Sequence, residues 1–282
     1  MNILREQTKK IYDSTPVSDG AGVKLKRIIG SQNLDHIDPF VLLDEFKSKN
    51  VNDYMAGFPD HPHRGIETIT YMIHGKFRHR DSEGNGGILG PGDVQWMTAG
   101  KGIIHSEMPE MEKGLLWGYQ LWLSLPAKDK MTNPRYQHLH SEEIPVINDN
   151  FSEIRLIAGR YHEETGPAET WFPIDYFDVR IKIAGLFRKK IESRNNTFIY
   201  VHTGSVIVKT DDGMELTVGN GELALIENTK TIEIGSSTNN AGFLFISGRP
   251  NKEPIARRGP FVMNTDEELV KAFDDYYRGE FT

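Results

Sequence analysis

The sequence predicts an all-β protein made of two β-barrel domains followed by one short C-terminal helix. Segments in which apolar and polar residues alternate recur along the chain, and Gly, Asp, Asn and Pro separate them, as sandwiches and barrels require. Helical spacing of apolar residues is clear only in residues 265–279. Since no sequence repeat of about 20 to 50 residues accompanies the strands, we expect two barrels of similar shape but divergent sequence.

Length and composition are those of a globular protein. The 282 residues suffice for about two domains with their own cores, and 26% of them are charged and 38% apolar. The net charge of -7 argues against a nucleic-acid-binding surface, which needs clustered Lys and Arg to contact phosphates. We therefore expect no direct nucleic-acid partner.

Compartment and chemistry are also constrained by the sequence. Its start, MNILREQTKKIY, lacks the apolar core of a signal peptide, and the apolar stretch at 115–125 is too short and too polar to span a bilayer. We therefore expect a cytoplasmic protein without a membrane partner. The chain has no Cys, which excludes disulfides, thiolate metal sites and a cysteine nucleophile. Any bound metal must be held by histidine and carboxylate.

Several stretches predict individual strands. The clearest are residues 115–125, 177–183, 197–218 and 222–227. In the first, every second residue is apolar or aromatic, which predicts a strand with one fully buried side. The third predicts a hairpin with Asp212-Gly213 at its turn, because this dipeptide tolerates positive φ.

The domain boundaries follow from a polar segment with two prolines at 131–150, which we interpret as part of the connection between domains. The predicted division is an N-terminal domain at 1–133, a connection at 134–170, a C-terminal domain at 171–250 and a C-terminal segment at 251–282.

The C-terminal segment contains the predicted helix. Thr265 and Glu268 are spaced as a capping box, and Gly279 is placed to end the helix. Its apolar face consists of Leu269, Ala272, Phe273 and Tyr276.

Two histidine-containing segments predict a metal site. His61 and His63 begin the strand-like run HPHRGIETITYMIHG, and His105 and Glu107 have the same spacing at the end of GDVQWMTAGKGIIHSE. Residues two apart on a strand point to the same side, so these four side chains would converge if the segments lie side by side. Three imidazoles and one carboxylate suit a divalent first-row metal and leave positions open for substrate or O2.

The other histidines have weaker support. His138 and His140 share the spacing but lie in the polar connection beside Ser141, and we predict that they are surface residues. His74 and His79 either line the mouth of the site or occupy solvated hairpin positions. The second half has no such pair in its strands, where His202 stands alone, so we expect its barrel to be metal-free.

The motifs H-P-H-R-G-I-E-T-I-T-Y, H-R-D-S-E-G-N-G-G and G-D-V-Q-W-M-T-A-G-K-G-I-I-H-S-E-M-P together resemble those of the pirins, a branch of the cupin superfamily. Residues 38–46 and 259–265 also resemble pirin segments, so the resemblance covers nearly the whole chain. It implies a bicupin, with two barrels of the double-stranded β-helix type and one iron per chain in the N-terminal barrel. The implied ligands are His61, His63, His105 and Glu107, and other divalent first-row metals are possible.

The sequence departs from the general cupin pattern at two positions. The segment from Ala99 to His105 lacks the proline of that pattern, as it does in pirins. The general pattern would also make Glu67 a ligand, but the resemblance to pirins favours Glu107 instead. Glu67 would then be a neighbour of the ligands or a strand-face carboxylate.

The resemblance implies two functions of different classes. The first is a dioxygenase of the quercetin 2,3-dioxygenase type, which takes a small phenolic substrate and O2 and uses Glu107 as catalytic base. The alternative is a non-enzymatic, iron-dependent regulatory protein that binds protein partners, as a transcriptional co-regulator or a modulator of metabolic enzymes. Both functions share the metal ligands. The resemblance further implies that the C-terminal segment returns to the N-terminal domain.

Overall fold

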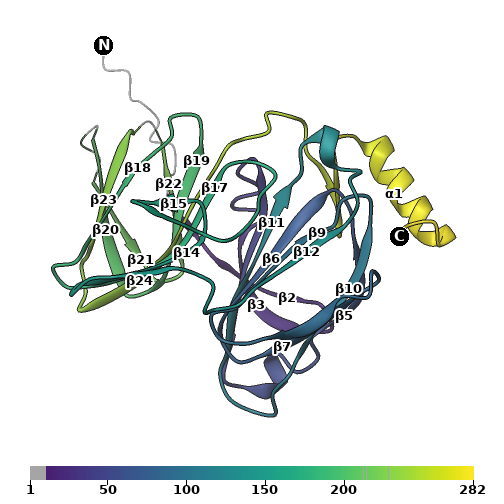
Figure 1. Cartoon of the computed structure of the whole chain (residues 1–282), viewed down its shortest axis with the longest axis horizontal. Helices are drawn as coiled ribbons and strands as arrows, with labels where there is room; N and C mark the ends of the chain where they lie inside the picture. The colour runs from purple at the N-terminus through teal and green to yellow at the C-terminus, as the bar shows by residue number, and fades with distance from the viewer. Residues whose placement is uncertain (1–10, 212, 214, 228) are drawn as a thin grey trace.

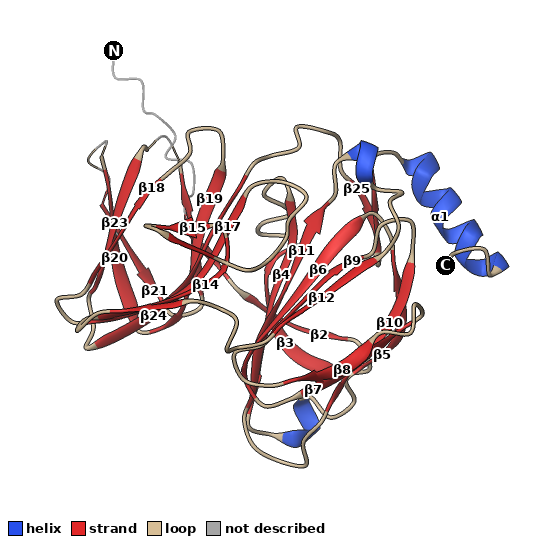
Figure 2. Ribbon diagram, viewed as in Figure 1, coloured by secondary structure: helices blue, strands red, loops and turns tan. Residues whose placement is uncertain are grey.

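A computed structural model describes residues 11–211, 213, 215–227 and 229–282. Strands dominate, as predicted (Figure 2). The helical elements of this part of the chain are α1 (Asp266–Arg278) and the 3-10 turns η1 (Val51–Asp53) and η2 (Ala127–Asp129). None of the described helices is long and apolar enough to span a bilayer.

The first barrel consists of two antiparallel sheets. The larger one has the order β12 (Arg135–Leu139), β9 (Val94–Thr98), β6 (Ile66–His74), β11 (Leu116–Ser124), β4 (Phe40–Ser48), β3 (Val23–Ile29), β2 (Thr15–Asp19). The smaller one has the order β5 (Phe58–His63), β10 (Ile103–Pro109), β7 (Phe77–Asp81), β8 (Gly86–Leu89).

The second barrel repeats this plan. Its larger sheet has the order β1 (Ile11–Asp13), β22 (Glu222–Ile226), β19 (Asn196–Thr203), β24 (Asn240–Gly248), β17 (Ile174–Lys182), β14 (Ser152–Ala158), β13 (Val146–Asn148). Its smaller sheet has the order β18 (Leu186–Lys190), β23 (Thr231–Ser236), β20 (Ser205–Thr210), β21 (Glu215–Gly219). Two short pairs, β15 (Arg160–Tyr161) with β16 (Glu164–Thr165) and β25 (Ala256–Arg258) with β26 (Phe261–Met263), complete the strands.

Several strands do not follow the predicted domain boundaries. β1 lies before the first barrel in sequence but pairs with β22 of the second. The predicted connection at 134–170 holds β12 at the edge of the first barrel and β13 and β14 in the second. β12 and β13 escape detection because they are short, half-buried edge strands whose sequences resemble a polar linker.

The predicted hairpin is present as the antiparallel pair β20 and β21, although Asp212 of its turn lies outside the described residues. The predicted strand at 115–125 is β11, but both of its faces are buried rather than one. Tyr119 and Leu121 pack in a core shared with the second barrel, whereas Leu116 and Trp122 face the interior of the first. A strand in the wall of a barrel that is itself covered by another barrel has no solvated side.

Between the barrels lies a hydrophobic core of its own. Leu43 and Ile69 of the first barrel pack in one cluster with Tyr176, Phe198 and Leu244 of the second. A separate cluster fills the second barrel, and two smaller ones lie in the first. Part of the apolar surface of the first barrel is therefore directed outward to the neighbouring barrel.

The predicted C-terminal helix is confirmed as α1. Thr265 and Glu268 form the capping box, and Gly279 ends the helix with a left-handed φ of 71°. Leu269 and Ala272 are buried. Figure 1 shows that α1, although last in the chain, lies against the first barrel and far from the second. Arg64 of the first barrel accordingly makes an ion pair with Asp275 at 2.7 Å.

Candidate metal centre

Three of the four predicted ligands meet where β5 pairs with β10. The strands run antiparallel, with His105 opposite His61 and Ile103 opposite His63. Residues two apart on a strand project to the same side, so the three imidazoles share one face. Their ring centroids lie 4.4 to 5.0 Å apart, and one nitrogen of each ring lies within 4.8 Å of the other two.

Hydrogen bonds leave ring nitrogens free for a metal. The Nδ1 of His61 donates to the Pro59 carbonyl at 2.8 Å, and the Nδ1 of His63 donates to the Pro260 carbonyl at 3.2 Å. Because a carbonyl only accepts, Nε2 keeps its lone pair in both rings. The Nε2 of His63 and both nitrogens of His105 are buried without a hydrogen-bond partner. Such atoms are costly when unsatisfied, and a divalent first-row metal fits this donor set.

Burial also keeps these imidazoles neutral. Removal from water lowers the pKa of His63 and of His105 well below the usual value, and the neighbouring His61 acts in the same direction. A ligating imidazole must be unprotonated. The two buried rings are therefore in their metal-binding form at physiological pH.

Glu107, the fourth predicted ligand, lies on β10 but outside the group of three. A register shift between His105 and Glu107 places Glu107 opposite Phe58 of β5. Its buried carboxylate accepts hydrogen bonds from Thr70 Oγ1 at 2.6 Å and Gln120 Nε2 at 2.8 Å. Burial raises the pKa of this carboxyl above its usual value. Glu107 is thus a buried carboxylate with increased proton affinity on the strand that carries His105.

Glu67, the ligand of the general cupin pattern, lies on the other side of the sheet. Thr70 of β6 reaches Glu107 inside the barrel, and Glu67, three residues earlier, projects to the opposite face. There it accepts a hydrogen bond from Thr98 at 2.8 Å, and burial raises its pKa to about 7. Because successive side chains of β6 point to opposite faces of the sheet, Glu67 lies on the face opposite to the barrel interior, which contains the three imidazoles.

A cavity of ≈ 500 Å³ opens beside His61 and His63. Its lining includes Phe46, Phe58 and Trp122 and the polar residues Arg27, Asp44, Gln120 and Arg257. Trp122 packs edge-on against His63 at 4.8 Å between ring centroids, and its Nε1 donates to Gln120 Oε1 at 3.1 Å. The cavity has the size and the mixed aromatic and polar lining of a small-molecule site, which typically measures about 300–1,000 Å³.

The structure contradicts the expectation of a solvated position for His79. It is buried and hydrogen-bonded to the hydroxyl of Tyr136 at 2.5 Å, so it is not a solvated hairpin residue. His74 is exposed and stacks on Trp117 at 6.1 Å between ring centroids. His202, for which the sequence offered no partner, is buried with its Nε2 3.0 Å from Asp178 Oδ1. That partner comes from the neighbouring part of the sheet, which no local pattern reveals.

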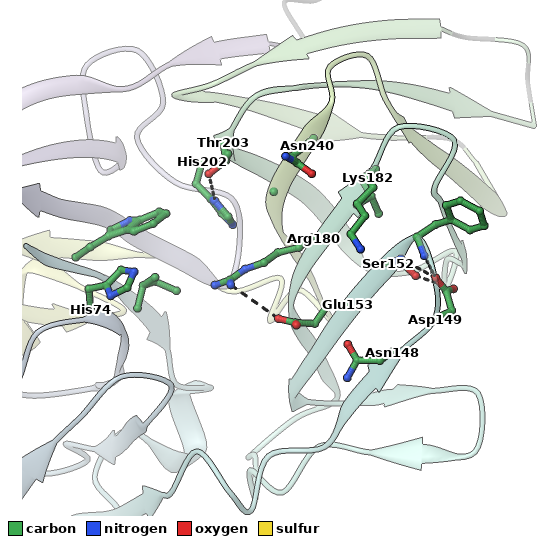
Figure 3. Close-up of a pocket in the computed structure, with 16 residues that line it drawn as sticks. His74, Asn148, Asp149, Ser152, Glu153, Arg180, Lys182, His202, Thr203 and Asn240 are labelled. Carbon is green, nitrogen blue, oxygen red and sulfur yellow. Dashed lines mark hydrogen bonds and ion pairs between the residues drawn. The ribbon is translucent and has the colours of Figure 1, made fainter.

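A second cavity, of ≈ 420 Å³, lies between the two barrels. Figure 3 shows His74 on one side and Arg180, Lys182 and Glu153 on the other, with Arg180 directed toward Glu153. Their charged groups are 3.8 Å apart. Neither of the two groups of candidate metal ligands in the described part of the chain lines this cleft. It is therefore distinct from the metal centre.

Sequence comparisons place this geometry in a family. The family model described as Pirin matches residues 22–123, and the one described as Pirin C-terminal cupin domain matches residues 176–282. A pirin-like protein from Caulobacter vibrioides is 41% identical over 278 residues, which cover 96% of this chain and 98% of that protein. The chain belongs to the pirin family. The region matched by the Pirin model contains all three clustered histidines, so the candidate metal centre lies within it.

Other comparisons agree with the pirin assignment. Human pirin is 37% identical over 267 residues, which cover 92% of this chain and 88% of that protein. The crystal structure of quercetin 2,3-dioxygenase from Acinetobacter baumannii superposes with a TM-score of 0.87 at 31% identity, covering 97% of each chain. The predicted fold of two cupin barrels with one C-terminal helix is therefore confirmed.

Proposed function

We propose that this chain is an iron-dependent dioxygenase that cleaves flavonols such as quercetin with O2. The observation that carries the proposal is the group of three imidazoles, with unpartnered ring nitrogens, at the wall of an aromatic-lined cavity. The similarity to the A. baumannii protein named quercetin 2,3-dioxygenase supports the same reaction class. Bound iron would supply a Lewis acid and a redox-active centre, and another divalent first-row metal could occupy the same donor set.

In this proposal His61, His63 and His105 hold one iron per chain, and Glu107 is the fourth ligand. The carbonyls of Pro59 and Pro260 orient two of the rings through their Nδ1 protons. Thr70 and Gln120 hold the carboxylate on the barrel-interior side of β10. Such partners fix the direction of each donor atom before the metal arrives.

Glu107 is also the proposed base. A flavonol must lose its hydroxyl proton before its oxygen can serve as an anionic donor, and Glu107 is the buried carboxylate that follows His105 on β10 and could accept that proton. In this step the O–H bond of the substrate breaks and the proton passes to a carboxylate oxygen of Glu107. Gln120 lines the cavity and donates a hydrogen bond to Glu107. It therefore contacts both the proposed base and the space proposed for the substrate.

The aromatic walls provide the remaining selectivity. Phe46, Phe58 and Trp122 offer faces and edges on which the planar rings of a flavonol can stack, and they keep water from the metal ligands. Arg27, which lies in the same lining, is held by Asp44 through two hydrogen bonds of 3.0 and 2.7 Å. The cavity thus combines aromatic side chains with polar side chains held in place by hydrogen bonds, and recognition of a polyphenol needs both.

Replacement of Glu107 by Gln tests the catalytic role. Gln keeps the size of the side chain but removes its charge and most of its basicity. We expect Glu107→Gln to retain some iron through the three histidines and to consume oxygen with quercetin about 100-fold more slowly than the wild type. The measurement is oxygen uptake at matched iron content. The control is Glu110→Gln, which changes a carboxylate paired with Arg78 at the end of β10 and should react at the wild-type rate. A wild-type rate for Glu107→Gln would rule out this base.

A second candidate function is that of an iron-dependent regulatory protein that binds a protein partner. The cleft between the barrels supports it, because it joins residues of both barrels and presents Lys182 and the exposed ring of Phe151 away from the metal centre. The same oxygen-uptake assay separates the two functions. If the iron-loaded wild type consumes no oxygen with quercetin or any phenol of a small panel, the regulatory function replaces the enzymatic one.

A further inference from the structure

A second group of metal-binding side chains lies at the edge of the first barrel. One ligand atom from each of Asp93, His138 and His140 lies within 4.8 Å of the other two. We infer that this group is a second divalent-cation site, suited to Zn²⁺, at the point where the chain leaves the first barrel. The site takes no part in the proposed oxygenation.

The register of the edge strands brings these residues together. β12 pairs antiparallel with β9, and His138 lies opposite Gln95. Two positions further on in each direction, His140 and Asp93 fall on the same side of the sheet as His138. The two imidazoles are stacked with centroids 4.0 Å apart, and Asp93 Oδ2 lies 3.6 Å from His138 Nε2.

One observation points to a ligand at this place. The Nε2 of His138 is buried and has no hydrogen-bond partner, although it faces the carboxylate of Asp93. A buried ring nitrogen that faces a carboxylate oxygen at 3.6 Å, beyond hydrogen-bonding distance, is an arrangement that a cation can complete.

The carboxylate of Asp93 is already oriented. Its Oδ1 accepts a hydrogen bond from the backbone N–H of Ser141, and its Oδ2 accepts one from that of Gly90, both at 2.8 Å. A carboxylate has about four acceptor positions, so these two bonds leave capacity for a metal. Because the donors are backbone groups on each side of the site, the carboxylate needs little rearrangement to bind.

Local charge also favours a cation. Burial lowers the pKa of His138, which keeps its ring available as a neutral ligand. Glu143 adds a negative charge near Asp93, where its carboxylate accepts a hydrogen bond from the His140 N–H at 2.8 Å, and Arg155 contributes one positive charge beside Ser141. Two imidazoles and a carboxylate form a common donor set for Zn²⁺, and the exposure of His140 leaves the fourth position to water.

The position of the site suggests its structural effect. Ser141, which binds Asp93, also accepts a hydrogen bond from Arg155 of β14 in the second barrel at 3.2 Å. A cation held by Asp93, His138 and His140 would therefore stabilise the connection between the two barrels. A ligand that binds only the folded state raises the melting temperature.

Titration of the iron-loaded full chain, prepared without a histidine tag, with Zn²⁺ tests the inference. We expect the wild type to take up one equivalent of Zn²⁺ beyond its iron, with iron content unchanged and a higher melting temperature. His140→Ala and Asp93→Asn should each weaken this binding more than about tenfold, since even the loss of an outer hydrogen-bond partner costs about 10–100-fold in metal affinity. Affinity is measured by competition with a chromophoric chelator, and metal content by elemental analysis.

The matched control is His36→Ala. His36 is also exposed beside a carboxylate, with its Nδ1 2.7 Å from Asp35 Oδ2, but it belongs to neither group of three ligands. This variant should bind Zn²⁺ as the wild type does. The inference is overturned if the wild type takes up no further equivalent, if zinc only replaces iron, or if His140→Ala binds zinc with wild-type affinity.

Discussion

His105 and His202 are equally buried, yet their surroundings give them different roles. The Nε2 of His202 lies 3.0 Å from an Asp178 oxygen and its Nδ1 3.1 Å from the hydroxyl of Thr203, so both nitrogens are satisfied within the protein. Both nitrogens of His105 lack a partner and face two further imidazoles. A metal ligand is therefore distinguished from a structural histidine by its unsatisfied atoms and not by its burial.

At the same scale, we expect His61→Ala and His105→Ala to lose the iron. Each change removes one of three imidazoles, and the remaining donors no longer surround the metal. Elemental analysis of protein refilled with iron should show a fall from one equivalent to a small fraction. His140→Ala should keep its iron, because His140 belongs to the separate group on β12. Full iron content in His105→Ala would mean that the centre lies elsewhere.

Glu67 gives a pH-dependent prediction. Its folded pKa of about 7 lies above the usual value of 4.5, because burial disfavours the charged form. The folded state therefore binds the Glu67 proton more tightly than the unfolded state does. The stability that this provides is fully present below pH 4.5 and is lost as the pH rises through 7. Glu67→Gln stays neutral and can still accept the hydrogen bond from Thr98. We expect this variant to be more stable than the wild type by about 2 to 3 kcal/mol at pH 8, with little difference near pH 5.

Urea unfolding of both proteins at pH 5 and pH 8 measures this difference. Glu153→Gln is the control, because Glu153 is half-exposed at the cleft. Its free energy of unfolding should depend on pH as that of the wild type does. A parallel pH dependence in the wild type and Glu67→Gln would contradict the buried-carboxylate argument.

At the scale of elements, the segment of β25, β26 and α1 connects the end of the chain to the candidate metal centre. Pro260 supplies the carbonyl that orients His63, and Phe261 bridges to Arg64. The guanidinium of Arg64 in turn binds Asp275 of α1 and lies 4.5 Å from the ring centroid of Phe281. The last segment therefore covers the strand that carries two ligands, although the second barrel separates them in sequence.

Truncation after Met263 should accordingly destabilise the first barrel. It removes Leu269 and Phe281, both buried, and each large apolar side chain contributes about 1.5 to 3 kcal/mol on burial. We expect a clearly lower melting temperature or aggregation. The point variant Leu269→Ala should lose about 2 to 5 kcal/mol, whereas Val270→Ala, at an exposed neighbouring position, should change stability little. An unchanged melt of the truncated chain would show that α1 contributes nothing to the barrel.

For the whole molecule, the contacts between the two barrels predict one folding unit. Their facing sheets share a hydrophobic core, and buried hydrogen bonds cross it. Tyr200 of the second barrel donates to Glu45 at 2.8 Å, and Tyr71 of the first donates to Asp178 at 2.8 Å. Neither barrel can bury these groups alone, so separation would expose apolar surface and remove one buried tyrosine donor from each carboxylate.

Tyr200→Phe tests this coupling. The change leaves Glu45 Oε2 buried without its tyrosine donor, which should cost about 1 to 3 kcal/mol. We expect the midpoint of urea unfolding to fall while circular dichroism and tryptophan fluorescence still report one coincident transition. Tyr277→Phe, at a position that is 78% exposed, serves as the silent control. Two separate transitions in the wild type would show that the barrels unfold independently.

Features that depend on local spacing can be predicted from the sequence alone. The two-residue period of a strand placed His61 with His63, and the capping box with its terminal glycine marked α1. Tertiary structure alone decided the strand exchange by β1, the place of Glu107 outside the three imidazoles, and the meeting of Asp93 with His138 and His140. These depend on which strands become neighbours and in which register. That choice is made by long-range packing, and a shift of one residue moves every side chain to the other face.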